Sequence, residues 1–314
     1  MIKNTLYICL IITISACVKN TEIDNKNFAE ESTQDINKII MEDKSGQSIT
    51  LEKIDGNRWI VNQKYPAWKD QIEYTLKVME DIRVKSSVSE SAYNTVMKNL
   101  ATTAVKIEIY KEDELTKTYY IGGNTNDHLG TYMIMKNSHT PFIMHIPDRR
   151  PGILNPKFGL EGNNVNKNVW RERIKISINA EDIQDIESNN LIDPLESFKL
   201  EAKTKTVYNK NHKKTYYNSE TYKEFINSFS ELKCGGYSNI SRKNIKKIKI
   251  IKISTNEKRT YELKIYEKIK KKRNQNEFNP NVEIYYATWN NSDLVIIQKN
   301  IFNKVLINLS EIKI

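Results

Sequence analysis

The sequence predicts an α+β fold of two similar units, each a mainly antiparallel sheet packed with one or two helices. Three observations lead to this class. Extended segments with alternating apolar residues recur along the chain between turn signals. A few stretches instead carry apolar residues at helical spacing. The order of these segments then recurs in the second half, and such internal repetition favours two related units.

The first half predicts a β-meander, two helices and four further strands. Residues 35–62 hold apolar runs separated by the turn signals KSGQ and DGN, in which glycine tolerates a positive φ. A helix is expected next, with Pro66 in its first turn. The apolar stripe of this helix consists of Ile72, Leu76, Met79 and Ile82. Ser89 is the expected N-cap of a second helix over 89–104. Strands are then expected at 105–112, 115–123, 130–137 and 141–147.

The second half repeats this order with one helix, over 219–232, for which Ser219 is the expected N-cap. The strands expected before and after it are 183–190, 196–204, 205–210, 245–255, 259–268, 281–289 and 293–306, the last turning helical. We therefore expect a first unit over 31–150, a connecting loop over 151–180 and a second unit over 181–314. The connection is either a surface loop packed by Leu154, Phe158 and Trp170 or a linker between repeats.

The N-terminus has the pattern of a secretory signal peptide. Lys3 precedes an apolar run over 6–15, which is shorter than the ~20 residues that span a bilayer. The order Ile14-Ser15-Ala16-Cys17 resembles the bacterial lipobox. That resemblance implies that residues 1–16 are removed, that a diacylglycerol is attached to Cys17, and that 17–30 form a flexible tether. The alternative is an ordinary secretory signal with a chance cysteine.

Charge and cysteine content narrow the class of protein. Residues 199–273 hold 22 lysines and arginines against 7 acids, a net charge of +15, whereas the whole chain carries +10. An export signal argues against nucleic acid as the partner, so the excess is either a solvated lysine face or a surface for anionic envelope polymers. Besides Cys9 and Cys17 only Cys234 remains, so no internal disulfide framework is expected. Because Gly235 and Gly236 follow it, we expect a turn and an unreactive thiol there.

Several segments together resemble the DUF4340 family, particularly its lipoprotein members from the Bacteroidota. They are ITLEKIDGNRWIVNQKYPA, KIEIYKEDELTKTYYIGGNTNDHLGTYMIM, PFIMHIP and NVWRERIKI, and the similarity extends from about Phe28 to Ile307. The family is of unknown function. Some of its members lie beside components of ABC transport systems, which implies an accessory or scaffold role in the envelope. Val18, in place of Asp, implies outer-membrane sorting by resemblance to enterobacterial lipoproteins.

Candidate chemistry is sparse. The four histidines form no metal-binding spacing, and no nucleophile or nucleotide motif is present. Asp127 and His128 follow Gly122-Gly123 in YIGGNTND and are the possible binding residues, although a tight turn closed by an Asp–His hydrogen bond explains them as well. The tyrosine pairs 119–120, 216–217 and 285–286 each place one ring toward solvent, where sugars could stack, or simply pack across strands.

These observations predict a lipid-anchored protein of the cell envelope, on the periplasmic face or surface of the outer membrane. Its expected role is non-enzymatic, as a binding, scaffold or accessory component with no catalytic residue, cofactor or metal. Its expected partners are the membrane, through Cys17, and envelope proteins or anionic glycans. The alternatives are a carbohydrate- or polyanion-binding module and a hydrolase with its site in the 122–128 loop.

Overall fold

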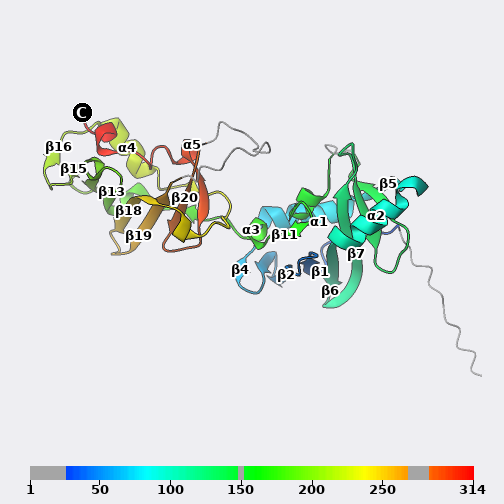
Figure 1. Ribbon diagram of the computed structural model, residues 1–314. Helices are drawn as coiled ribbons and strands as arrows, with labels where there is room; N and C mark the ends of the chain where they lie inside the picture. The colour runs from blue at the N-terminus through cyan, green and yellow to red at the C-terminus, as the bar shows by residue number, and fades with distance from the viewer. Residues whose placement is uncertain (1–25, 148–151, 268–282) are drawn as a thin grey trace, which may run out of the picture.

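The computed structural model describes residues 26–147, 152–267 and 283–314. Two large antiparallel sheets dominate it and lie apart from each other, with α3 between them (Figure 1). The predicted α+β class is confirmed.

The first sheet has nine strands in the order β4-β3-β2-β1-β6-β7-β8-β9-β5. Every neighbouring pair is antiparallel. The strands are β1 (Ile36–Glu42), β2 (Ser48–Asp55), β3 (Arg58–Val61), β4 (Tyr65–Pro66), β5 (Arg83–Ser87), β6 (Val105–Lys111), β7 (Glu114–Asn124), β8 (Thr131–Met135) and β9 (Phe142–His145).

The second sheet has eight strands in the order β16-β15-β14-β13-β18-β19-β20-β21, again antiparallel throughout. The strands are β13 (Ile183–Asn190), β14 (Phe198–Glu201), β15 (Thr206–Asn209), β16 (Lys214–Thr215), β18 (Lys247–Thr255), β19 (Thr260–Tyr266), β20 (Ile284–Trp289) and β21 (Val295–Gln298).

Short helices and two small ladders complete the chain. The helices are α1 (Lys69–Asp81), α2 (Glu90–Thr103), α3 (Lys167–Trp170), α4 (Ser219–Asn227), α5 (Lys299–Phe302) and α6 (Leu309–Ile312), with 3-10 turns η1 (Asn155–Phe158), η2 (Ala180–Asp182), η3 (Pro194–Glu196) and η4 (Arg242–Asn244). The ladders pair β10 (Leu160–Glu161) with β11 (Asn164–Val165) and β12 (Lys175–Ile176) with β17 (Leu232–Lys233).

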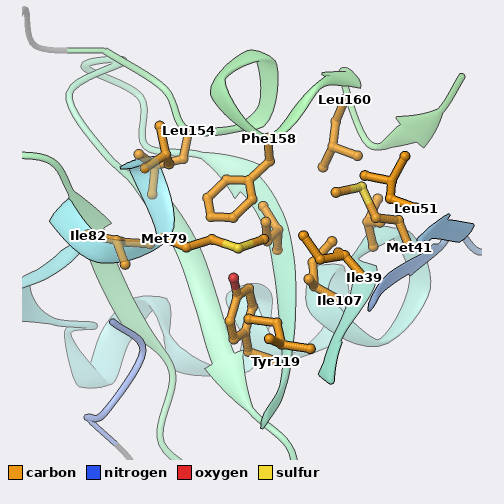
Figure 2. Packing of buried hydrophobic residues seen from close by; sticks show 14 of the residues in the cluster. Ile39, Met41, Leu51, Met79, Ile82, Ile107, Tyr119, Leu154, Phe158 and Leu160 are labelled. Atoms are coloured by element: carbon orange, nitrogen blue, oxygen red, sulfur yellow. The ribbon is translucent and has the colours of Figure 1, made fainter. Parts of the chain in front are cut away.

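Each sheet has its own apolar core. In the first, strand residues such as Ile39 and Ile107 face Met79 of α1 and Phe158 of η1, with Tyr119 beside them (Figure 2). Leu154 and Trp170 are also fully buried in this core, so the segment expected to connect the halves packs largely on the first sheet. The second core gathers Phe225 and Phe229 near α4 with the inward faces of β13, β14, β18 and β19.

Two predicted helix starts are wrong in detail. Pro66 lies in β4 at the end of the sheet order, where its missing N–H costs no bond to β3, because the N–H of Ala67 and not residue 66 donates to Trp59 O. Helix α1 begins later, after Trp68. The N-cap of α4 is Asn218 and not Ser219, because the Asn218 side chain accepts hydrogen bonds from the first free N–H groups of the helix. Ser89 does occupy the N-cap position of α2, without a side-chain bond.

Gly235 and Gly236, expected in a turn, lie in paired backbone instead, and Gly122 and Gly123 lie in the strand expected over 115–123. Gly122 and Gly123 belong to β7, and a Cβ on Gly122 would lie 2.6 Å from Leu100 Cδ2 of α2. The N–H of Gly235 donates to Ile296 O at 2.7 Å, and a Cβ added at Gly235 would lie 2.8 Å from that oxygen. Close approach of neighbouring segments, and not a positive φ, explains Gly122 and Gly235.

Candidate functional site

The first described residues, before β1, pack onto the first sheet. Phe28 is fully buried and lies 6.1 Å from the Tyr119 ring and 6.2 Å from the Phe142 ring. Glu30 is buried beside it and pairs with Lys111 Nζ at 2.8 Å and Lys117 Nζ at 3.1 Å. The tether predicted to extend to residue 30 is therefore part of the fold from Phe28 onward.

Cys17, the predicted lipidation residue, and the whole predicted signal peptide lie outside the described residues. Within the described ranges, none of the helices combines the length and apolar content that crossing a bilayer requires.

The loop with Asp127 and His128 is held by hydrogen bonds within the loop. Asp127 Oδ1 accepts from the Thr125 hydroxyl and from the Leu129 N–H at 2.9 Å. The Thr125 bond contributes most to lowering the pKa of Asp127. His128 is exposed with a left-handed φ of 55°, and the turn is closed by Thr125 and not by the Asp–His bond considered above. Neither residue lines any of five well-formed pockets in the described part of the chain.

The described part of the chain contains neither a reactive thiol nor a cluster of metal-ligating side chains. Cys234 is 5% exposed, and burial raises its pKa to about 12, so the thiol stays protonated and unreactive at neutral pH. The same residues contain no cluster of three or more His, Cys, Asp or Glu side chains that could hold a metal ion.

The most developed polar site lies where the chain passes from one sheet to the other. Here the guanidinium of Arg171 is sandwiched between two tyrosine rings, 3.9 Å from the centre of the Tyr65 ring and 3.7 Å from that of Tyr237. Arg173 stacks on Trp68 at 4.5 Å. Each such contact contributes about 0.5–2 kcal/mol, depending on desolvation. We call this arrangement the junction.

Local backbone structure positions both arginines. Trp170 is buried in the first core, and Ile174 packs against the second, so only three residues lie between them. In this extended stretch alternate side chains face the same side, which brings Arg171 and Arg173 onto one face. Gly236 leaves room for Arg173, because a Cβ there would lie 2.5 Å from Arg173 Nη1. Burial lowers the pKa of Arg173.

Arg171 is only 7% exposed and only partly bonded. Its Nη1 lies 2.9 Å from Asp293 Oδ2 and donates to Asn168 Oδ1 at 3.2 Å. Its Nε is buried and has no hydrogen-bond partner. An unsatisfied buried donor costs about 1–3 kcal/mol, so this N–H is available to donate to a further partner.

A polar pocket of about 300 Å³ opens at the junction. Among the residues that line it are Tyr65, Lys167, Arg171, Tyr237, Arg242 and Asp293. The hydroxyl of Tyr237 is engaged with Glu172 O at 3.0 Å. The pocket is thus a cation-rich hollow with amide and hydroxyl groups, suited to binding an acidic group.

The sequence interpretation missed this site. The segment NVWRERIKI contains both arginines at alternate positions, which is a signal for a shared face. The aromatic residues that receive them come from positions far apart in the chain, and no local pattern links Tyr65 to Tyr237.

A family model described as a domain of unknown function (DUF4340) matches residues 59–245, more than half of the chain. The chain belongs to the DUF4340 family. The DUF4340 region contains the stacked residues Tyr65, Arg171 and Tyr237, as well as Asp127 and His128, whereas Asp293 lies beyond it. Neither the curated proteins nor the solved structures yielded a match.

Proposed function

We propose that this DUF4340 protein is a lipid-anchored component of the cell envelope with a binding or scaffold role. The observation that carries the proposal is the order Ile14-Ser15-Ala16-Cys17 directly after a short apolar run. The burial of Phe28 supports it, since ten residues then separate the anchor from the start of the fold. Ten extended residues reach at most ~35 Å, so the folded part would stay close to the membrane surface.

The proposed location is the outer membrane, on its periplasmic face or at the surface. Val18 favours this sorting, by resemblance to lipoproteins that leave the inner membrane. An accessory role beside an ABC transport system is the proposed context, since some DUF4340 members in other bacteria lie beside components of such systems.

A Cys17→Ser variant tests the anchor. The wild-type protein should incorporate a labelled fatty acid and fractionate with membranes, whereas the variant should lose both properties. A variant that stays labelled and membrane-bound would remove the basis of the proposal. Affinity capture of the lipidated protein from membranes then tests the role, with transporter subunits as the expected enriched partners.

We further propose that the molecule consists of two similar units. Equivalent backbone contacts before α1 and before α4 support this. The N–H of Trp68, before α1, donates to Trp170 O at 2.7 Å, and the N–H of Asn218, before α4, donates to Ile312 O at 2.8 Å. Isolated bridges accompany both contacts, from Ala67 to Arg171 and from Tyr217 to Lys313.

Strand order and irregularities support the same proposal. Omitting β5, the first sheet runs β4-β3-β2-β1-β6-β7-β8-β9, and the second runs β16-β15-β14-β13-β18-β19-β20-β21, with equivalent chain directions. Both first strands shift register by one residue at their starts, between Ile36 and Lys38 and between Ile183 and Asp185. A bulge at the same place in both sheets is a conserved type of feature and not a random defect.

A second candidate function is binding of an anionic polymer such as an acidic glycan. It is favoured by the β15–β16 hairpin, where Lys210, Lys213 and Lys214 are exposed and Tyr216 is 87% exposed. A titration with an acidic polysaccharide at increasing salt tests it. Binding should weaken steeply as salt screens these lysines, and absent or salt-insensitive binding would exclude this candidate.

A further inference from the structure

The pocket at the junction carries a surplus of positive charge. Three cationic side chains line it, those of Lys167, Arg171 and Arg242, against the single carboxylate of Asp293. Two positive charges are therefore left uncompensated among the lining groups. A pocket of this charge attracts an anion and holds it more strongly than open water-exposed lysines do.

The three cationic side chains of the pocket differ in how firmly neighbouring groups hold them. Arg171 is 7% exposed, fixed by two tyrosine rings, and keeps an unpartnered buried Nε. Arg242 is oriented by donating to the Ser292 carbonyl oxygen. Lys167 is exposed, makes no ion pair within the described residues, and lies 5.8 Å from the Tyr65 ring. A fixed arginine beside an exposed lysine is a suitable arrangement for binding a compact anion.

From this geometry we infer that the junction pocket binds a compact oxyanion, a phosphate or a carboxylate group, between Arg171, Lys167 and Arg242. Arginine recognises such groups through paired N–H donors, and its planar fork is held here by the tyrosines. The pocket is lined from both halves of the molecule, because Lys167 and Arg171 flank Trp170 of the first core whereas Arg242 and Asp293 belong to the second half. A bound anion therefore links the two halves. This inference deepens the proposed binding role and rests on it, but it does not depend on the lipid anchor.

Calorimetric titration of the full-length protein in detergent with inorganic phosphate tests the site. The wild-type protein should bind phosphate, with affinity that falls as ionic strength rises. Lys167→Gln should weaken binding about tenfold, equivalent to ~1.4 kcal/mol, and should not disturb folding because Lys167 is exposed. The matched control is Lys98→Gln, an exposed charge removal on α2, which should leave the affinity unchanged.

Asp293→Asn gives the sharpest discrimination. Asp293 pairs with Arg171 and repels an anion, so removing its charge should tighten phosphate binding several-fold. A purely structural ion pair would give no gain. Absence of wild-type binding at millimolar phosphate, equal effects of Lys167→Gln and Lys98→Gln, or weaker binding by Asp293→Asn would each overturn the inference.

Two further arms identify the source of the anion, and both use the Cys17→Ser background so that the anchor plays no part. Citrate in place of phosphate tests a carboxylate source. Vesicles containing phosphatidylglycerol test a phospholipid headgroup, with flotation of the variant expected to depend on Lys167. If phosphate binds and the vesicles do not, the ligand is a free or soluble anion. If Cys17→Ser still incorporates the labelled fatty acid in cells, the anchor proposal fails while the pocket stands.

Discussion

Individual residues decide how closely neighbouring segments approach in this fold. Gly235 is held against the β21 backbone through bonds between 235–236 and Ile296. Paired glycines usually indicate a turn. That interpretation is wrong for Gly235 and Gly236, which instead leave room for Ile296 and Arg173. The contact of Gly122 with Leu100 is likewise not indicated by the neighbouring sequence.

A substitution at Gly235 therefore has a predictable cost. Gly235→Ala places a methyl group 2.8 Å from a backbone oxygen that cannot move freely, so the free energy of unfolding should fall by about 1–3 kcal/mol. Gly123→Ala, where nothing lies within 4 Å, is the matched control and should change stability by less than ~0.5 kcal/mol. Denaturant unfolding of the two variants measures this, and equal effects would refute the contact explanation.

A buried lysine makes stability depend on pH. Lys249 is 5% exposed, donates to Leu306 O and Ile307 O, each at 2.7 Å, and burial lowers its pKa from 10.5 to about 8. Above pH 8 the folded protein releases this proton while the unfolded chain keeps it until about pH 10.5. The unfolded state then binds more protons, so stability should rise with pH across this range.

Lys249→Met isolates that effect. The wild-type minus variant difference in free energy of unfolding should increase between pH 8 and 10.5, by an amount on the order of 3 kcal/mol, because tyrosine and cysteine titrations are common to both proteins. Denaturant unfolding at each pH provides the measurement. A pH-independent difference would show that Lys249 titrates normally.

At the scale of elements, period-two alternation predicted most strands, and a period of 3.6 predicted α1, α2 and α4. The sequence did not predict β5, β4 or β16. These strands are short or polar, and β5 pairs with β9 far along the chain, so its place depends on tertiary packing. Helix starts were displaced by one to three residues because capping depends on bonds that several neighbouring residues could make.

The N-terminal docking segment is an element without regular structure that should still stabilise the first sheet. Phe28→Ala removes a fully buried ring between Tyr119 and Phe142, so unfolding should become easier by about 3 kcal/mol. Tyr74→Ala on α1, where the ring is 42% exposed, is the control and should cost less than ~1 kcal/mol. Similar losses for both would mean that the segment does not pack as described.

At the scale of the molecule, the two cores are separate, and the chain crosses between them within the junction. The sequence predicted an α+β protein with recurring order, but not how the halves meet, because stacking of Arg171 joins residues from three distant segments. We therefore expect two unfolding transitions. Ile107→Ala, in the first core, should shift one of them, and Ile251→Ala, in the second core, should shift the other.

Differential scanning calorimetry checks that expectation. Each substitution removes a fully buried side chain and should cost about 2–5 kcal/mol in its own core. A single cooperative transition shifted equally by both variants would contradict two independently packed units.

The location proposed for the protein rests on the lipid anchor, so the chemistry of Cys17 is the most direct test. Mass spectrometry of the N-terminal tryptic peptide from the membrane-extracted protein measures it, because trypsin cuts after Lys19. We predict a peptide that begins at Cys17, ends at Lys19 and carries a diacylglycerol on the cysteine sulfur. An unmodified Cys17, or a mature chain that begins at another residue, would contradict the proposed anchor.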